Sequence, residues 1–99
     1  MPAYFIGNYT IINPKLYMQY VSKAMPLTIK HGGRALVAGE GTQILEGNPG
    51  GTTIVLQFPS MDAAMAWYND PEYQAIIPMR HEATEGGFAQ MANGFVLPG

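Results

Sequence analysis

The sequence has 99 residues, 47% hydrophobic and 12% charged, with a formal net charge of −2, which fits one domain with a single modest core. Its five basic residues are scattered along the chain, whereas phosphate backbones are bound by clustered Lys and Arg, so no nucleic-acid partner is expected. The absence of cysteine excludes disulfides, thiolate nucleophiles and Cys-ligated metals.

The first part of the chain predicts a strand followed by a helix. Residues 3–12 are rich in aromatic and β-branched side chains, which suit a pleated sheet. Asn13 and Pro14 then provide an N-cap and a first helical residue. The helix has one apolar face, and we expect Pro26 to kink it or to end its regular part near Ala24.

The middle of the chain is rich in strand signals. Residues 34–39 predict a short strand, and residues 42–46 predict either a second short strand or a bulged continuation of the first. Glycine, asparagine and proline at residues 48–51 indicate a loop. Residues 52–58 are apolar almost throughout, so we place this strand in the centre of the sheet.

The last third predicts two helices and a final strand. Ser60 caps a short helix, and Asp70 caps a longer one. Gly86 and Gly87 turn the chain into residues 88–97, the last strand.

This order of elements predicts an α+β fold over residues 1–99, a single ferredoxin-like βαββαβ domain. Its antiparallel sheet carries helices on one face. The strands are apolar on both sides, since Ile6 and Val55 alternate with Phe5 and Leu56. We therefore expect a second copy of the chain to cover the other face, sheet against sheet, in a homodimer.

Several short motifs appear in an order typical of a known family. They are "MPAY" at the start, Asn13-Pro14, "GGRALVAG" at 32–39, "LEG" at 45–47, "FPS" at 58–60 and, most specific, "WYNDPEYQAI" at 67–76 followed by Arg80. Through these motifs residues 1 to about 85 resemble domain-of-unknown-function family 1330, in the dimeric α/β-barrel superfamily. The resemblance implies that two ferredoxin-like sheets pair into a barrel. The superfamily also includes cofactor-independent monooxygenases and isomerases, so the fold alone does not define a function.

Two positions depart from the family pattern. The resemblance implies an acid on the first strand, where this chain has Asn8, and another before "FP", where it has Gln57. Neutral amides bind ligands but do not act as bases near neutral pH. Buried amides need hydrogen-bond partners, so Asn8 and Gln57 either pair with each other, bind a water or bind a ligand. We take ligand binding as the hypothesis for both.

Arg80 is the leading candidate for a functional residue. It shares the apolar side of its helix with Tyr73 and Ile77. Its guanidinium either binds an anionic group of a ligand or is structural, complementing the helix C-terminus or pairing with an acid. Trp67 and Tyr73 are either core residues or aromatic walls of a ligand pocket.

His81 is a candidate general acid–base, because imidazole titrates near neutral pH. The alternative, which we favour, is a half-exposed residue at the end of a helix. His31 and His81 have no acidic partners at the spacing of a metal site, so neither a metal nor a cofactor is expected.

These residues are compatible with functions of different kinds. One is the binding of a small anionic or aromatic metabolite between helices and sheet, with Arg80 orienting it. Another is a cofactor-independent monooxygenase or isomerase acting on an enolic or phenolic metabolite, with Arg80 stabilising the enolate and His81 as base. A third is a fold that serves assembly only. Because the sequence shows no signal peptide and no apolar run of membrane-spanning length, we expect a cytoplasmic protein without a membrane partner.

Overall fold

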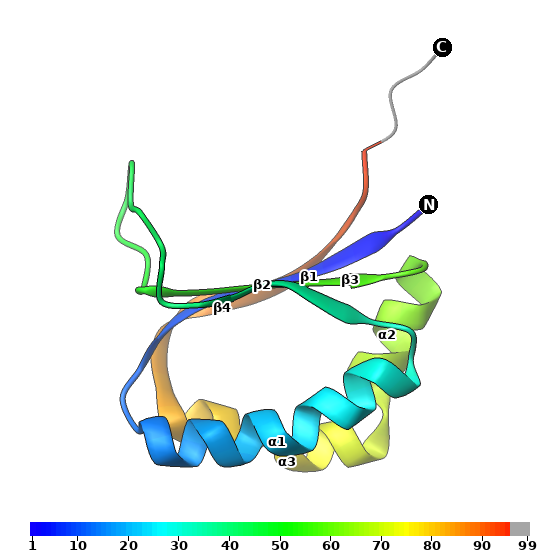
Figure 1. Ribbon diagram of the computed structural model, residues 1–99, viewed down its shortest axis with the longest axis horizontal. Coiled ribbons are helices and arrows are strands. Elements are labelled where there is room, and N and C mark those ends of the chain that lie inside the picture. Colours follow the sequence, from blue (N-terminus) through cyan, green and yellow to red (C-terminus); the bar gives the residue numbers. More distant parts are fainter. Residues whose placement is uncertain (96–99) are drawn as a thin grey trace.

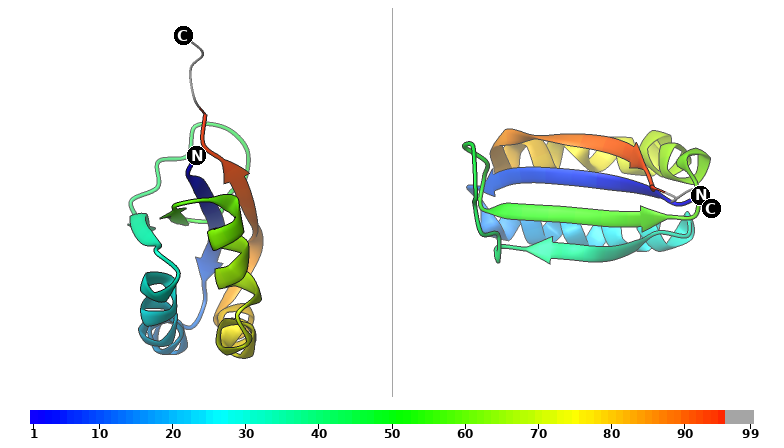
Figure 2. Two further views of the ribbon diagram at one scale, coloured as in Figure 1. Left: turned by 90° about the vertical axis from the view of Figure 1, so that its right-hand side faces the viewer. Right: turned by 90° about the horizontal axis from the view of Figure 1, so that it is seen from above.

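The computed structural model describes residues 1–95, which form a four-stranded antiparallel sheet with three helices on one face (Figure 1). The elements in chain order are β1 (Ala3–Ile11), α1 (Pro14–Lys30), β2 (Arg34–Gly39), β3 (Thr52–Phe58), α2 (Met61–Asn69), α3 (Pro71–Ala83) and β4 (Thr84–Asn93). The strands lie in the order β2-β3-β1-β4 (Figure 2). The ferredoxin-like α+β fold and the central place of β3 are thus confirmed.

Each helix begins at the residue that the sequence predicts. The side chains of Asn13, Ser60 and Asp70 accept hydrogen bonds from backbone N–H groups of the first helical turns. Such caps satisfy donors that have no partner inside the helix. The sequence therefore determines the helix starts locally.

The first helix runs through Pro26 and ends at Lys30, so its regular part does not end near Ala24. In Figure 1, α1 bends toward the sheet in its second half. Proline removes one helical hydrogen bond and bends a helix, but a well-packed following turn can still form. That turn is fixed here by Thr28, which is 1% exposed and whose hydroxyl donates to the Ala24 carbonyl at 3.0 Å.

Residues 42–46 form an irregular loop, so the predicted strand or continuation of a strand is absent. The Ile44 and Leu45 side chains are 51% and 88% exposed. The loop is attached to the sheet by a hydrogen bond of 2.6 Å between the hydroxyls of Thr42 and Thr53. The β propensity of these apolar residues alone does not make a strand, because the segment pairs with no strand of residues 1–95 and its large apolar side chains are exposed.

The glycine pair near the C-terminus lies inside the last strand rather than in a turn before it. β4 starts at Thr84, directly after α3, and its pairing with β1 shifts register between Asn8 and Thr10. Gly86 and Gly87 have φ angles of 67° and 75°, and a Cβ on Gly87 would overlap the Asn8 carbonyl. The two glycines thus form a bulge. The part of the predicted strand beyond residue 95 lies outside the described residues.

An aromatic cluster fills the core where α2 and α3 meet the sheet. Trp67 is 1% exposed. Its ring centroid lies 5.2 Å from those of Phe5 and Phe58 and 4.2 Å from that of Tyr73. These contacts hold one end of the sheet tightly against the helices.

None of the three helices covers the other face of the sheet (Figure 1). It presents apolar side chains on neighbouring strands, among them Ile6 and its partner Val55. Val37 and Phe88 on the flanking strands are 46% and 49% exposed. Coverage of this face by a second copy stays a prediction.

Asp70 joins the end of α1 to the start of α3. The carboxylate lies 2.8 Å from His31 Nε2 and accepts hydrogen bonds from Lys30 Nζ at 3.1 Å and from the Glu72 N–H at 2.9 Å. These contacts lower the pKa of Asp70 to about 2. The contact with His31 has the largest effect, and the hydrogen bond from the Glu72 N–H has the next largest.

We expect the contribution of Asp70 to stability to depend on pH. Its pKa is lower in the folded protein than the ordinary value of 3.8, so ionised Asp70 stabilises the fold above about pH 4 and this contribution is lost as the pH falls toward about 2. The urea midpoint of Asp70→Asn should therefore lie below the wild-type midpoint near neutral pH and converge with it in acid. Asp62→Asn, at an exposed first-turn acid of α2, is the control. A gap that stays constant down to about pH 2 contradicts this account.

Candidate functional site

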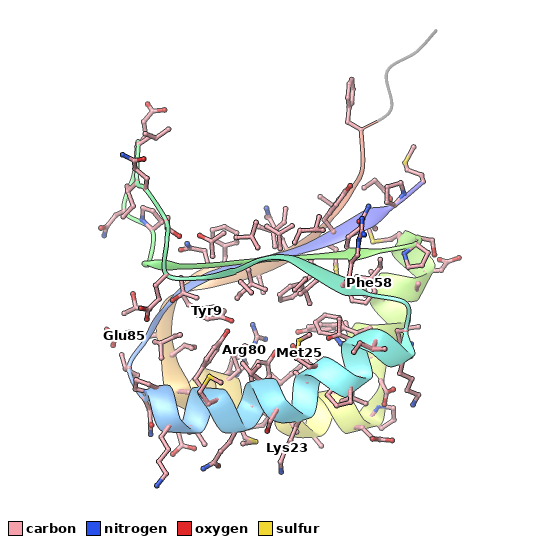
Figure 3. All side chains as sticks on the ribbon, in the orientation of Figure 1. Tyr9, Lys23, Met25, Phe58, Arg80 and Glu85 are labelled. Atoms are coloured by element: carbon pink, nitrogen blue, oxygen red, sulfur yellow. The ribbon has the colours of Figure 1, made fainter. Side chains whose placement is uncertain are left out.

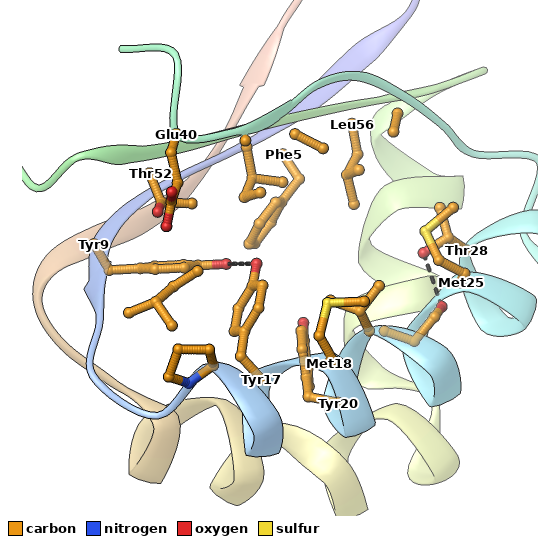
Figure 4. A pocket seen from close by; sticks show the side chains of 18 of the residues that line it. Phe5, Tyr9, Tyr17, Met18, Tyr20, Met25, Thr28, Glu40, Thr52 and Leu56 are labelled. Atoms are coloured by element: carbon orange, nitrogen blue, oxygen red, sulfur yellow. Dashed lines mark hydrogen bonds between the residues drawn. The ribbon is translucent and has the colours of Figure 1, made fainter.

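A cavity of about 450 Å³ lies between α1 and the sheet (Figure 4). Small side chains from both sides border it, namely Ala24 of α1 and Ala35 and Ala38 of β2. Larger apolar residues of β1 and β3, including Phe5 and Leu56, close its inner wall. This volume and lining are typical of a site for a small organic molecule.

Two pairs of tyrosine hydroxyls connect α1 to its neighbours. The hydroxyls of Tyr9 on β1 and Tyr17 on α1 lie 2.7 Å apart, and those of Tyr20 on α1 and Tyr73 on α3 lie 2.6 Å apart. All four side chains are buried, and Tyr9, Tyr17 and Tyr20 line the cavity. In each pair one hydroxyl donates and the other accepts, so the accepting hydroxyl keeps a hydrogen for a third partner.

These phenols stay protonated at neutral pH. Burial raises the pKa of Tyr9, Tyr17, Tyr20 and Tyr73, because it disfavours the charged phenolate. The positive charge of Arg80 lowers each pKa but does not cancel the effect of burial. The hydroxyls therefore act as hydrogen-bond donors in an apolar setting.

Arg80 lies buried among these tyrosines, between α3 and the sheet (Figure 3). The side chain is 5% exposed, and its Nε has no hydrogen-bond partner among residues 1–95. Both ion pairs in this range belong to Asp70, so Arg80 has no acidic partner in the described part of the chain. Arg80 is not among the residues that line the cavity, although three of the tyrosines on which its charge acts are.

The two predicted aromatic residues take different places. Trp67 lines the cavity, and its Nε1 is buried without a hydrogen-bond partner among the described residues. Tyr73 is 0% exposed and reaches the cavity only through its bond to Tyr20. Both belong to the aromatic core, and Trp67 is also a pocket wall.

Asn8 and Gln57 face away from the cavity. Strand side chains alternate, so Asn8 lies on the face opposite Tyr9. It fixes the loop before β3, donating to the carbonyls of Gly50 and Thr52 at 3.1 and 3.2 Å and accepting from the Gly50 N–H at 2.8 Å. On the same face, Gln57 accepts a hydrogen bond from Arg34 Nε at 2.9 Å. The ligand-binding interpretation of these two amides does not apply to this cavity.

His81 is exposed and is not part of the cavity lining, so the geometry gives it no access to a ligand held there. The lining contains instead a carboxylate, Glu40, at the end of β2. No sequence pattern points to Glu40, because this residue lies in an irregular segment whose direction depends on the tertiary fold. The alternation of β1 and the apolar face of α1 could have located Tyr9 and Tyr17.

Two structural features of other protein classes are absent from residues 1–95. No group of three or more His, Asp or Glu side chains is placed to hold a metal ion. No helix in this range is long and apolar enough to cross a membrane.

The fold and the cavity define a ferredoxin-like protein with a tyrosine-lined pocket between helices and sheet. A family model described as "Domain of unknown function (DUF1330)" matches residues 2–93, and the chain belongs to this family. The predicted family relationship is therefore confirmed. No curated protein matches the sequence.

Solved structures share the fold at low sequence identity. A protein of unknown function from Rhodopseudomonas palustris superposes with a TM-score of 0.78 at 16% identity, over 97% of this chain and 84% of that one. A dimeric ferredoxin-like protein of unknown function from Thermobifida fusca gives 0.63 at 16% identity, over 93% and 90%. SnoaB, a cofactor-independent oxygenase from Streptomyces nogalater, gives 0.66 at 9% identity, over 97% and 95%. At these identities the likeness shows the fold alone.

We expect Arg80→Met to preserve or increase stability. Methionine fills a similar apolar space, and the substitution removes a buried charge that has no acidic partner among the described residues, which should raise the free energy of unfolding by about 1 kcal/mol. Urea unfolding followed by far-UV circular dichroism measures this change. Arg34→Met, on the opposite sheet face, is the control and should alter stability by about 0.5 kcal/mol or less. A loss above about 2 kcal/mol for Arg80→Met would assign the guanidinium a structural role.

Proposed function

We propose that this protein binds a small aromatic or anionic metabolite in the cavity between α1 and the sheet. The observation that carries the proposal is an apolar cavity of about 450 Å³ with buried tyrosine hydroxyls on its wall, close to an Arg80 that has no acidic partner among residues 1–95. The side chains around an unfilled cavity lose van der Waals contacts, and a bound ligand restores them.

The lining favours a flat ring system with one polar oxygen. Phe5, Trp67 and Leu56 offer faces and edges for an apolar ring. The Tyr9–Tyr17 pair offers a donor to a carbonyl, hydroxyl or carboxylate oxygen of the ligand. Arg80 adds a positive potential that the low-dielectric surroundings screen weakly, so a negative oxygen is favoured.

We further propose that the protein acts as a homodimer. The apolar face of the sheet opposite the helices supports this, because it is wide and open in one copy of the chain (Figure 2). Fold neighbours from Thermobifida fusca and Bacteroides fragilis are themselves described as dimeric. The ligand cavity lies on the helix side, so pairing of the sheets leaves it accessible.

Binding can be tested with 2-naphthol and 2-naphthoate as probes. A ligand at about 100 times its dissociation constant stabilises the native state by about 2.7 kcal/mol, so both probes should raise the thermal midpoint. We expect Ala38→Phe, which fills the cavity from β2, to abolish this shift. Val37→Phe is the matched control. Val37 is the residue next to Ala38, but its side chain points to the opposite face of the sheet and does not line the cavity.

The proposal fails if neither probe raises the wild-type midpoint, or if Ala38→Phe and Val37→Phe respond equally. Arg80→Met separates the two kinds of ligand. It should weaken 2-naphthoate about 10-fold or more, the effect of a charge interaction worth about 1.4 kcal/mol, while 2-naphthol binding changes little.

A further inference from the structure

We infer that the cavity also catalyses proton transfer at a carbon next to a carbonyl group, with Glu40 as the base and the Tyr9–Tyr17 pair as the donor to the enolate oxygen. The inference rests on the proposed function, since the ligand must first occupy the cavity. It assigns the site a substrate class, aromatic ketones with an acidic neighbouring C–H bond.

Glu40 is the acidic residue among the cavity-lining side chains of the described chain. It follows directly after β2 and is solvent-exposed, and Figure 4 shows its side chain pointing from the strand end toward Tyr9 and Thr52. No ion pair within residues 1–95 engages its carboxylate. A carboxylate that faces a ligand and lacks a cationic partner has the chemistry of a general base.

The Tyr9–Tyr17 pair lies in the same part of the cavity as Glu40 (Figure 4). One of the two hydroxyls retains a hydrogen that its partner does not use, because each phenol has a single O–H. Burial keeps both protonated by raising the pKa of Tyr9 and Tyr17. A fixed donor in an apolar site stabilises charge that develops on an oxygen more than water does.

The proposed step balances without an oxidant or cofactor. A Glu40 carboxylate oxygen takes the proton from the carbon next to the carbonyl, and the electron pair of that C–H bond becomes the C=C bond of the enolate. The carbonyl π electrons move to the oxygen, and the resulting enolate oxygen accepts a hydrogen bond from the free tyrosine O–H. If the protonated Glu40 carboxyl first exchanges its hydrogen with the solvent, return of a solvent hydrogen to the same carbon completes hydrogen exchange. Return of the proton to another carbon of a conjugated ligand isomerises it.

Hydrogen exchange of 2-tetralone in D2O tests the step. Proton NMR follows replacement of the C1 hydrogens by deuterium, and wild-type protein should accelerate it above the buffer rate. Glu40→Gln should lower the protein-dependent rate by about 100-fold or more, the usual share of a general base. The dissociation constant of 2-tetralone, from thermal shift, should change by less than about 3-fold, because the amide keeps the shape of the side chain. Glu46→Gln, on the same loop but outside the cavity lining, is the matched control and should exchange at the wild-type rate.

The double variant Tyr9→Phe/Tyr17→Phe tests the donor. Removing both partners of one hydrogen bond while keeping their shape leaves stability nearly unchanged, but the exchange rate should fall by about 100-fold. Binding of 2-tetralone without accelerated exchange, or exchange equal in Glu40→Gln and wild type, overturns the catalytic inference and leaves the binding function intact. Absence of any 2-tetralone binding to wild-type protein also overturns the catalytic inference, whereas the binding function fails only if 2-naphthol and 2-naphthoate leave the thermal midpoint unchanged as well.

Discussion

The spacing of α1 from the sheet depends on hydrogen bonds between buried tyrosine hydroxyls. Tyr9–Tyr17 joins β1 to α1, and Tyr20–Tyr73 joins α1 to α3, at 2.7 and 2.6 Å. A buried hydroxyl that loses its partner costs about 1–3 kcal/mol, so the helix cannot slide or collapse onto the sheet without breaking a bond. Small residues at Ala24, Ala35 and Ala38 leave the space between them unfilled. The cavity thus results from two features together: the hydrogen bonds that the buried hydroxyls must keep, and the small apolar side chains on its walls.

Strand alternation separates the chemistry of the two sheet faces. Phe5 and Tyr9 of β1 belong to the cavity, whereas Asn8 between them belongs to the other face and anchors the Gly50 loop. The amides at Asn8 and Gln57, which replace the acids implied by the family pattern, therefore concern the open face and its loop. Their neutral character does not bear on what happens in the cavity, where the carboxylate comes from Glu40.

The sequence predicted the fold well where the signals are local. Caps at Asn13, Ser60 and Asp70 and the apolar run of β3 determine helix starts and the sheet centre by short-range physics. The sequence predicts a turn at Gly86 and Gly87, where the structure has a bulge. The bulge needs glycine because β1 approaches closely there, and this contact between distant segments leaves no local sequence pattern. The direction of Glu40 and the partners of Asn8 likewise depend on contacts distant in sequence, and no periodicity encodes them.

Arg80 connects the buried tyrosines with the electrostatics of the cavity. A guanidinium that is 5% exposed and has a buried Nε without a partner is an expensive feature in a small domain. Its charge acts on four phenols, three of which line the cavity. Burial raises the pKa of these phenols, so they stay protonated and keep O–H groups that donate hydrogen bonds. The protein therefore holds, at the bottom of an apolar pocket, an environment that stabilises a negative oxygen more than a neutral one.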